Sequence, residues 1–418
     1  MPHTLLNTLR NLRGNARAAV ITEPLFGIPF NLYSPYVSIY MISIGLSESQ
    51  VGLVASVSLA GQIFVALLSG VITDKLGRKR ATLIFDLLAW TIPCLLWATA
   101  QNIVWFLIAG LVNSLRRIPD VSWTCILVED ADPADLAHIY AWVYIAGQLS
   151  VFFAPIAGIL ITHFSLTPTV RGLYLLACVM LTSKFFIMNR MVTETGQGVT
   201  RMEETRERSI LQLLGEYRGI AKRILATPQT LCTIALMTIM SIISTIQGSF
   251  WAILATKKLL IQEGWLAGFP IARSLIMMLV LFFAIPRMRG IRFGKPMMFA
   301  FAGLFLSLIL LVNTPVHGYL TLLASVLIES ACFAILSNQL ERLTVINVDA
   351  QERARIVSLA YVFVIACTTP FGWIAGILSE RNRLAPFILN LGFAMVGIVF
   401  VYLLHLTGAD RSEAALNE

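Results

Sequence analysis

The sequence predicts an all-α polytopic membrane protein whose twelve transmembrane helices form two six-helix bundles. Three observations lead to this fold class. Hydrophobic residues make up 57% and charged residues 13% of the 418 residues, against roughly half and a quarter in an ordinary soluble domain. Apolar runs of at least ~17 residues, long enough for a membrane helix, recur along the chain. A polar stretch near the middle separates two sets of six such runs.

The twelve apolar runs follow one another with short polar breaks. They are expected at 16–44, 50–73, 81–100, 103–128, 138–163, 172–191, 229–256, 264–286, 296–313, 318–343, 354–378 and 385–406. The first run is too long for the apolar part of a cleaved signal peptide, so we interpret it as a retained membrane helix.

Basic residues indicate the orientation in the membrane. They concentrate in the loops of one face, while the loops of the other face hold Arg171, Lys257, Lys258, Arg381 and Arg383. Because Lys and Arg favour cytoplasmic loops, we expect both termini in the cytoplasm and a location in the plasma (inner) membrane. The net charge of +8 then reflects contact with anionic lipids, and no nucleic-acid partner is expected.

The polar stretch in the middle predicts the domain organisation. It contains several charged residues and a segment with amphipathic character from Ile210 to Leu225. We expect an N-terminal six-helix bundle over 1–191, a cytoplasmic linker over 192–228 and a C-terminal six-helix bundle over 229–418. The two bundles repeat weakly at an offset near 217 residues, which suggests that they are related by pseudo-symmetry.

A charged loop follows the second apolar run and reads Gly70-Val-Ile-Thr-Asp74-Lys75-Leu-Gly77-Arg78-Lys79-Arg80. The pattern Gly-x-x-x-Asp-[Arg/Lys]-x-Gly-[Arg/Lys]-[Arg/Lys] in this context resembles the signature loop of the major facilitator superfamily, a family of secondary transporters. The resemblance implies alternating access by rocking of two bundles about a site near the bilayer midplane. It also implies a small-molecule substrate and no cofactor.

In that superfamily, the acid of the signature loop acts as a conformational latch that faces the start of helix 11. The resemblance gives this role to Gly70, Asp74, Lys75, Gly77, Arg78 and Lys79. Asp74 would then face Arg353 and Arg355, and the alternative is that it caps helix 3. Its counterpart in the second half is Ile291, so we expect the full latch in one half alone.

Helix 5 reads Gly147-Gln-Leu-Ser-Val-Phe-Phe-Ala154-Pro155-Ile-Ala-Gly158. It resembles the antiporter signature of exporters in the same superfamily, which ends Gly-Pro-x-x-Gly, with Ala154 replacing a glycine. Pro155 and Gly158 are expected to kink this helix, and Pro370 and Gly376 to do so in helix 11. The resemblance favours export, with ordinary helix packing as the alternative.

Ionisable residues inside membrane helices cost about 2.5–3.5 kcal/mol each on insertion scales, so each is a functional candidate. The sequence places Glu23, Arg116, Arg117, Asp120, Lys184, Arg273 and Glu329 inside the predicted spans. The superfamily lines its cavity with helices 1, 4, 7 and 10. Glu23, one of the two adjacent arginines and Glu329 are therefore expected to converge there.

Spacing on helix 4 suggests how its charges pair. Asp120 lies four residues after Arg116 and three after Arg117, so it can reach either one. Because adjacent helical residues point about 100° apart, we expect Asp120 to neutralise one arginine and leave the other available. Glu329 has no basic residue within one helical turn. It is expected either to bind protons or substrate, or to be a permanent partner of Arg273 or of helix 4.

Two sets of softer signals concern the lining of the cavity. Aromatic residues on helix 1 and polar residues on helix 7 could contact substrate, although both patterns are also typical of helix packing. These residues are Phe26, Phe30, Tyr33, Ser244, Gln247 and Trp251.

The sequence contains no phosphate-binding glycine loop, zinc motif or serine nucleophile elbow, so we expect neither an enzyme nor a metal site. The leading hypothesis is a secondary active transporter, a monomer that couples protons to export of a small organic or amphipathic molecule. One alternative is a transporter of an organic anion that uses the midplane arginines. Another is an uncoupled receptor, scaffold or lipid-moving protein. Unpaired arginines would favour the anion transporter.

Overall fold

The computed structural model describes residues 12–132, 135–207, 209–210, 228–288, 293–346 and 353–406. Every secondary-structure element in these ranges is helical. Contacts divide the chain into two compact units, residues 1–45 with 57–216 (unit 1) and residues 46–56 with 217–418 (unit 2). Residues 211–225 of the predicted amphipathic segment, Ile291 and the side chains of Arg353 and Arg355 lie outside the described residues.

The first six predicted spans each match a helix or a run of helical segments. In chain order these are α2 (Gly14–Tyr33), η1 (Ser34–Tyr36) and α3 (Val37–Ser43); α4 (Glu48–Leu76); α5 (Arg78–Asp86), η2 (Leu87–Thr91) and α6 (Ile92–Ala98); α7 (Ile103–Asn113), η3 (Ser114–Arg116) and α8 (Arg117–Val128); α9 (Leu136–Ser150), η4 (Val151–Phe153) and α10 (Ala154–Phe164); and α11 (Leu166–Met191). The linker begins with α12 (Gly196–Thr205).

The last six spans match in the same way. They are α15 (Pro228–Ile253) and η5 (Leu254–Lys258); η6 (Glu263–Ala267), α16 (Gly268–Leu279), η7 (Val280–Ala284) and α17 (Ile285–Arg287); α18 (Gly294–Val312); α19 (Tyr319–Ile346); α20 (Arg353–Arg381); and α21 (Ala385–Leu406). The predicted all-α fold class is confirmed.

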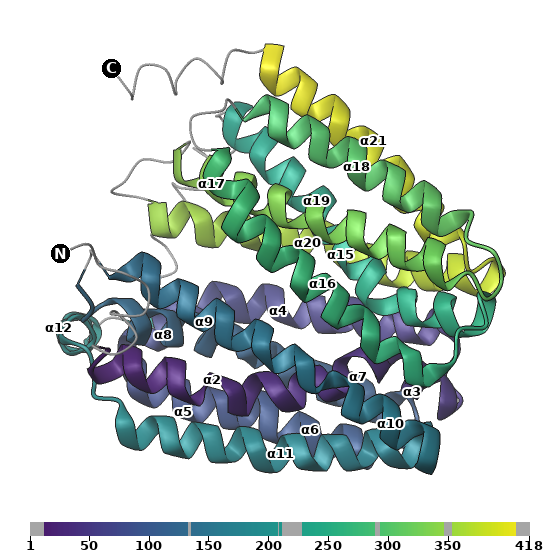
Figure 1. The fold of residues 1–418 in the computed structure, drawn as a ribbon. Coiled ribbons are helices and arrows are strands. Elements are labelled where there is room, and N and C mark those ends of the chain that lie inside the picture. The colour runs from purple at the N-terminus through teal and green to yellow at the C-terminus, as the bar shows by residue number, and fades with distance from the viewer. Residues whose placement is uncertain are drawn as a thin grey trace. The chain divides into compact units, whose positions relative to one another are not determined.

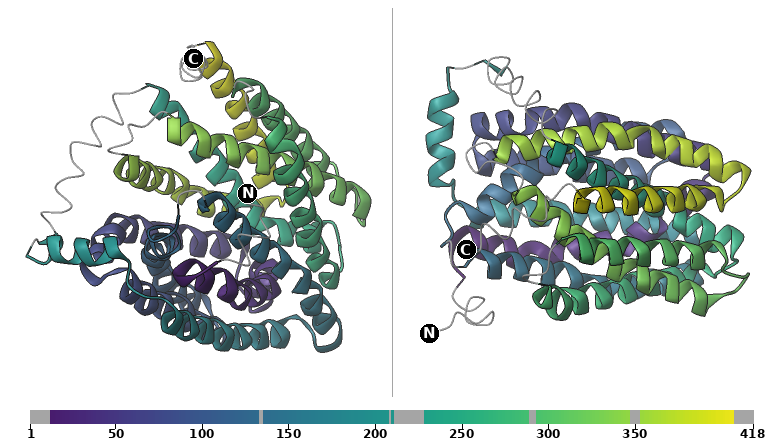
Figure 2. Two further views of the ribbon diagram at one scale, coloured as in Figure 1. Left: turned by 60° about the vertical axis from the view of Figure 1, so that its left-hand side comes forward. Right: turned by 90° about the horizontal axis from the view of Figure 1, so that it is seen from above.

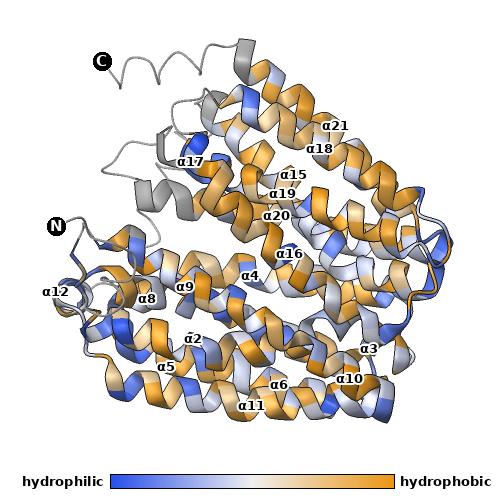
Figure 3. Ribbon diagram, viewed as in Figure 1, coloured by the Kyte–Doolittle hydropathy of each residue, from blue (hydrophilic) through white to orange (hydrophobic). Residues whose placement is uncertain are grey.

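Ten of these helices are long and apolar enough, within the described residues, to cross a membrane by length and composition. The first and fourth predicted spans are not among them. The first contains Glu23, and the fourth contains Arg116, Arg117 and Asp120. Figure 3 shows that hydrophobic residues dominate the helices and that hydrophilic residues gather at helix ends and at isolated positions along them.

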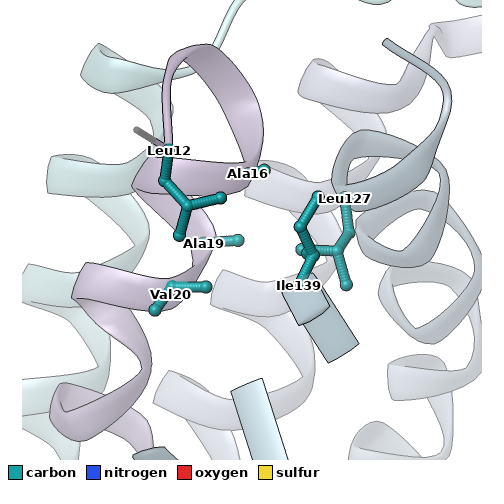
Figure 4. Packing of buried hydrophobic residues seen from close by; sticks show 6 residues of the cluster. All are labelled: Leu12, Ala16, Ala19, Val20, Leu127 and Ile139. Atoms are coloured by element: carbon teal, nitrogen blue, oxygen red, sulfur yellow. The ribbon is translucent and has the colours of Figure 1, made fainter. Parts of the chain in front are cut away.

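In unit 1, α2 packs against α9 and α11, while α11 also contacts α6 and α5 contacts α8 (Figure 1). The start of α2 is joined to α8 and α9 by a buried cluster of Leu12, Ala16, Ala19, Val20, Leu127 and Ile139 (Figure 4). The small alanines on α2 allow close approach of the neighbouring helices, as is common in membrane proteins.

In unit 2, α18 packs against α19 and α21, α15 against α20 and α21, and α16 against α19. The first turns of α4, which belong to this unit, lie against α20. A Cβ atom on Gly52 would meet the backbone oxygen of Gly372. Because that position has no space for a side chain, the two glycines set the separation of the helices there.

Polar contacts reinforce this crossing in unit 2. The Ser56 hydroxyl accepts a hydrogen bond from the backbone N–H of Trp373 and donates one to the carbonyl of Thr369. It is thereby inserted into the backbone hydrogen-bond ladder of α20 just after Pro370, a known cause of helix bending. Glu48 accepts hydrogen bonds from Ser379 and Arg383.

Candidate functional site

Unit 1 contains a cavity of about 200 Å³ among its membrane helices. Its lining combines acidic, basic and aromatic side chains from α2, α5, η2, α8 and α11. The lining residues are Glu23, Phe26, Asp86, Trp90, Pro119, Asp120, Trp123, Lys184 and Phe185. Charged groups within membrane helices are costly and are characteristic of functional sites in membrane proteins.

Lys184 on α11 is the cation of this cavity. Its Nζ atom lies 3.2 Å from Oε2 of Glu23 on α2 and 4.7 Å from the ring centroid of Phe26, one turn further along α2. The side chains of Lys184 and Glu23 are 7% and 15% exposed. The sequence analysis found both residues as intramembrane charges but could not pair them, because they are far apart in sequence.

Asp86 and Trp90 were missed by the sequence analysis. Asp86 ends α5, and Trp90 lies in the π-helical turn η2 that follows it. Asp86 forms no hydrogen bond or ion pair with any other residue that the structure describes, and its favourable electrostatic interaction is with Lys184. Asp86 lies within the predicted span 81–100, so the rule that selected Glu23 and Glu329 would have found it. A π-helical turn is itself frequent at functional sites.

Helix 4 differs from the prediction that Asp120 would leave one arginine available. Arg117 and Arg116 place Nη1 atoms 3.5 and 4.0 Å from Oδ2 of Asp120. Both guanidinium groups also donate to Oε1 of the buried Gln62 on α4. The expectation of one free cation is therefore wrong. Both side chains start from different sides of the helix, but they are long enough to reach the same two acceptors, Asp120 and Gln62.

The aromatic stripe of helix 1 divides between the cavity and packing. Phe26 lines the cavity, and its ring stacks on that of Phe30, with ring centroids 5.9 Å apart. Trp90 makes an edge contact with Phe26 at 4.9 Å between centroids. Tyr33 is buried against Tyr174, with ring centroids 4.7 Å apart, and does not line this cavity.

Unit 2 has a charged pair among α15, α16 and α19. The Nη2 atom of Arg273 lies 3.1 Å from Oε2 of Glu329, whose side chain is 7% exposed. The guanidinium carbon of Arg273 also lies 5.9 Å from the ring centroid of Trp251. Of the two alternatives for Glu329, the partnership with Arg273 is therefore present in the structure. A partnership does not exclude proton binding, because a protonated carboxyl releases its cation.

Helix 7 reaches this pair through Trp251, and the hydrogen-bonding groups of its polar residues are only partly satisfied. Gln247 is buried, and its Oε1 atom has no hydrogen-bond partner among the described residues; the same holds for Nε1 of Trp251. Ser244 is exposed. A buried acceptor and donor one helical turn apart can bind a polar group of a ligand, because leaving them unpaired costs about 1–3 kcal/mol each.

The signature loop binds the linker within unit 1. Asp74 accepts from Arg78 at 3.0 Å and from Arg201 of α12 at 2.8 Å. Figure 2 shows α12 running across the ends of the bundle helices of unit 1 rather than along them. Lys75 lies in the last turn of α4, and Gly70 lies further back in the same helix. The sequence analysis missed Arg201, and the charged composition of the linker was its only signal.

Glu194 caps the start of α5. Its carboxylate accepts the backbone N–H groups of Arg78 and Lys79 at 2.8 and 3.0 Å. The alternative in which Asp74 caps this helix is therefore wrong. Gly77 has φ +81°, and a Cβ atom there would meet the Glu194 carboxylate. Glycine is required at this position for the backbone conformation and for the close approach of Glu194.

Glu129, at the end of α8, completes this network. It accepts hydrogen bonds from Nε and Nη2 of Arg78 and from the hydroxyl of Thr195. Burial acts to raise the pKa of Glu129, but the hydrogen bonds from Arg78 and Thr195 outweigh it and lower that pKa below its ordinary value. The carboxylate is therefore ionised at neutral pH and holds the linker against the signature loop.

The predicted kinks lie at helix interruptions or close contacts. Pro155 stands at the first turn of α10, directly after the 3₁₀ segment η4, and Gly158 is buried in α10. Pro370 lies inside α20. A Cβ on Gly376 would meet the backbone of Glu48, so this glycine belongs to the α4–α20 crossing within unit 2.

A larger cavity of about 360 Å³ lies in unit 1 where α2 and α8 approach the linker. Several of its polar groups are engaged within the protein. Asn15 donates to Asp130 and to the carbonyl of Thr193, and the backbone N–H of Thr193 donates back to Asn15. These contacts attach the linker to the bundle, so we regard the 200 Å³ cavity as the candidate site.

Comparison with known proteins identifies the family. The model of the Major Facilitator Superfamily matches residues 25–367. The chain belongs to this superfamily of membrane transporters. The transporter class inferred from the signature loop is thereby confirmed, and members of this family are generally not enzymes.

The individual relatives of this superfamily member are distant. An uncharacterized MFS-type transporter of Bacillus subtilis (strain 168), YqjV, is 25% identical over 164 residues, which cover 37% of this chain and 40% of the relative. The nucleoside transporter NupG has a similar fold, with TM-score 0.69, 15% identity and coverage of 94% and 98% of the two chains. The human organic anion transporter MFSD10 gives TM-score 0.65 at 14% identity over 92% and 98%. At this level of identity, both solved structures support the fold alone.

Proposed function

We propose that this transporter couples proton movement to export of a small organic or amphipathic molecule by alternating access. The observation that carries the proposal is a carboxylate–cation pair beside an aromatic ring inside each unit. These pairs are Glu23 with Lys184 beside Phe26, and Glu329 with Arg273 beside Trp251. A carboxylate in a membrane interior is stable when it is paired or protonated, so proton binding and pair opening are linked.

We place proton coupling at Glu329. It is the more buried of the two paired carboxylates, and its partner Arg273 lies over the ring of Trp251, whose Nε1 atom has no hydrogen-bond partner among the described residues. A substrate polar group that binds the Nε1 atom of Trp251 would approach Arg273, the partner of Glu329. Proton binding to Glu329 and substrate binding beside Arg273 would each break the Glu329–Arg273 ion pair. The two events would then compete, as antiport requires.

Export is supported by the helix 5 sequence and by the 3₁₀ break at η4 before Pro155. We further propose that the transporter is a monomer in the plasma (inner) membrane with both termini in the cytoplasm, which the distribution of basic residues supports. The organic-anion alternative is less well supported, because Arg116, Arg117 and Arg273 all face carboxylates at 3.1–4.0 Å.

The test begins with a substrate. A thermal-shift screen of purified protein against amphipathic cations, neutral amphiphiles, sugars and organic acids identifies ligands, since binding to the folded state raises its melting temperature. A hit is then tested in proteoliposomes that contain a pH-sensitive dye. We expect an imposed pH gradient to drive accumulation and substrate to move protons in the opposite direction. Accumulation that is independent of the pH gradient would contradict proton coupling.

A further inference from the structure

The cavity in unit 1 has the composition of a cation site. Three carboxylates from three helices, those of Glu23, Asp86 and Asp120, line it together with one ammonium group, that of Lys184. Asp120 is shared with the two arginines of helix 4, which leaves Glu23 and Asp86 to face Lys184. With these groups ionised, the single ammonium group of Lys184 forms its ion pair with Glu23 and none with Asp86, so a ligand cation could take the place beside Glu23 while Lys184 turns to Asp86.

Lys184 shows where a cation is stabilised. Its ammonium nitrogen is 3.2 Å from the Glu23 carboxylate and 4.7 Å from the centroid of the Phe26 ring. A carboxylate combined with an aromatic face is the arrangement that proteins use to bind ammonium and quaternary ammonium ligands. Trp90 packs edge-on against Phe26 at 4.9 Å between centroids and extends the aromatic wall. The lysine thus occupies the position that a ligand cation would take.

The remaining lining defines the rest of the ligand. Trp123 and Phe185 add apolar surface, and the buried Nε1 of Trp123 has no hydrogen-bond partner among the described residues. The volume of about 200 Å³ is below the roughly 300–1,000 Å³ of common ligand pockets. It fits a compact cationic head with one attached ring.

We propose that this cavity binds the cationic head of an amphipathic organic cation, which displaces the Lys184 ammonium from Glu23 and Phe26. The inference rests on the proposed transport function and names its substrate class. Lys184 acts as a tethered competitor. In the absence of substrate its ammonium group pairs with Glu23, so that this carboxylate is not left unpaired in the membrane interior.

Binding to detergent-purified protein tests the proposal without any gradient. Calorimetric titration compares three probes of similar size, namely benzyltrimethylammonium, the neutral phenylacetamide and the anion phenylacetate. We expect wild-type protein to bind the cation in preference to the other two. Lys184→Met, which keeps the apolar stem but removes the competitor, should bind the cation about tenfold more tightly, and Phe26→Leu about tenfold more weakly. Lys258→Met, at an exposed lysine outside the cavity, should bind like wild type.

The double variant Glu23→Gln/Lys184→Met covers the case in which an uncompensated Glu23 prevents folding. It carries neither charge of the pair and should lose most of the gain seen in Lys184→Met. The proposal is overturned if Lys184→Met leaves cation binding unchanged or abolishes phenylacetate binding, because the lysine would then be an anion ligand. Proton-coupled transport of a neutral substrate without cation binding would overturn this inference alone, whereas cation binding without proton coupling would overturn the proposed function alone.

Discussion

Arg201 in the linker helix α12 binds Asp74 in the signature loop, with Nη2 2.8 Å and Nε 3.2 Å from the same carboxylate oxygen. Asp74 also pairs with Arg78, which in turn binds Glu129. The acid that the family resemblance assigns to a latch is thus bound by the linker in unit 1. We infer that linker docking and the availability of Asp74 are coupled, since Asp74 must release Arg201 to bind elsewhere.

Removing Arg201 should loosen α12. Arg201→Ala loses a two-pronged ion pair of a partly exposed side chain, for which about 1 kcal/mol is a reasonable magnitude. Amide hydrogen exchange over residues 196–205 should therefore accelerate about fivefold, and Asp74→Asn should have a similar effect that does not add to it. Arg206→Ala, at an exposed arginine one residue past the helix, serves as the control. Unchanged exchange in Arg201→Ala would show that this contact does not hold the helix.

The lowered pKa of Glu129 predicts a pH dependence of stability. Because hydrogen bonds from Arg78 and Thr195 lower this pKa in the folded state, the stabilisation is fully present above the ordinary glutamate pKa of about 4.3. It is lost as pH falls through the lowered value. The melting temperature of Glu129→Gln should thus be several degrees below wild type at pH 7, and the difference should shrink below pH 4. Glu207→Gln, at an exposed glutamate, should show no such trend. A difference that stays constant down to pH 3 would be inconsistent with this account.

Because Arg116 and Arg117 share Asp120, the three alanine variants of these residues should differ in their loss of stability. Asp120→Ala leaves two guanidinium groups with Gln62 as their common acceptor, and should cost about 1–3 kcal/mol. Arg116→Ala and Arg117→Ala should each cost less and resemble one another, because the remaining arginine still pairs with Asp120. Adding Arg116→Ala to Asp120→Ala should recover part of the loss in melting temperature. If one arginine variant is as unstable as Asp120→Ala while the other resembles wild type, the pairing is not shared.

Hydropathy was sufficient to predict the helices, and charge was sufficient to select most of the site. A bilayer imposes a minimum apolar length, so the twelve runs could be recognised locally, including the fourth despite Arg116, Arg117 and Asp120. The cost of an intramembrane charge selected Glu23, Lys184, Arg273 and Glu329. It would have selected Asp86 as well.

The partners of these charges could not be predicted from local sequence. Lys184 and Glu23 are 161 residues apart in sequence, and their contact depends on how α2 packs against α11. Gln62 accepts hydrogen bonds from both arginines of helix 4. Because it carries no charge, a search for ionisable residues in membrane helices does not select it. Arg201 was one basic residue among many in the linker, and its position opposite Asp74 follows only from the folded α12.

The most direct test of the account is uphill transport by Glu329→Gln in proteoliposomes, using a substrate from the thermal-shift screen. A glutamine can accept and donate hydrogen bonds but cannot alternate between a charged and a neutral form. Moving one charge through 100 mV contributes about 2.3 kcal/mol, roughly fifty-fold in a concentration ratio. We expect the variant to bind and exchange substrate yet lose accumulation driven by a pH gradient, while Glu380→Gln, at an exposed glutamate, accumulates like wild type. Full proton-driven accumulation by Glu329→Gln would contradict the account and leave Glu23 as the carboxylate to test for coupling.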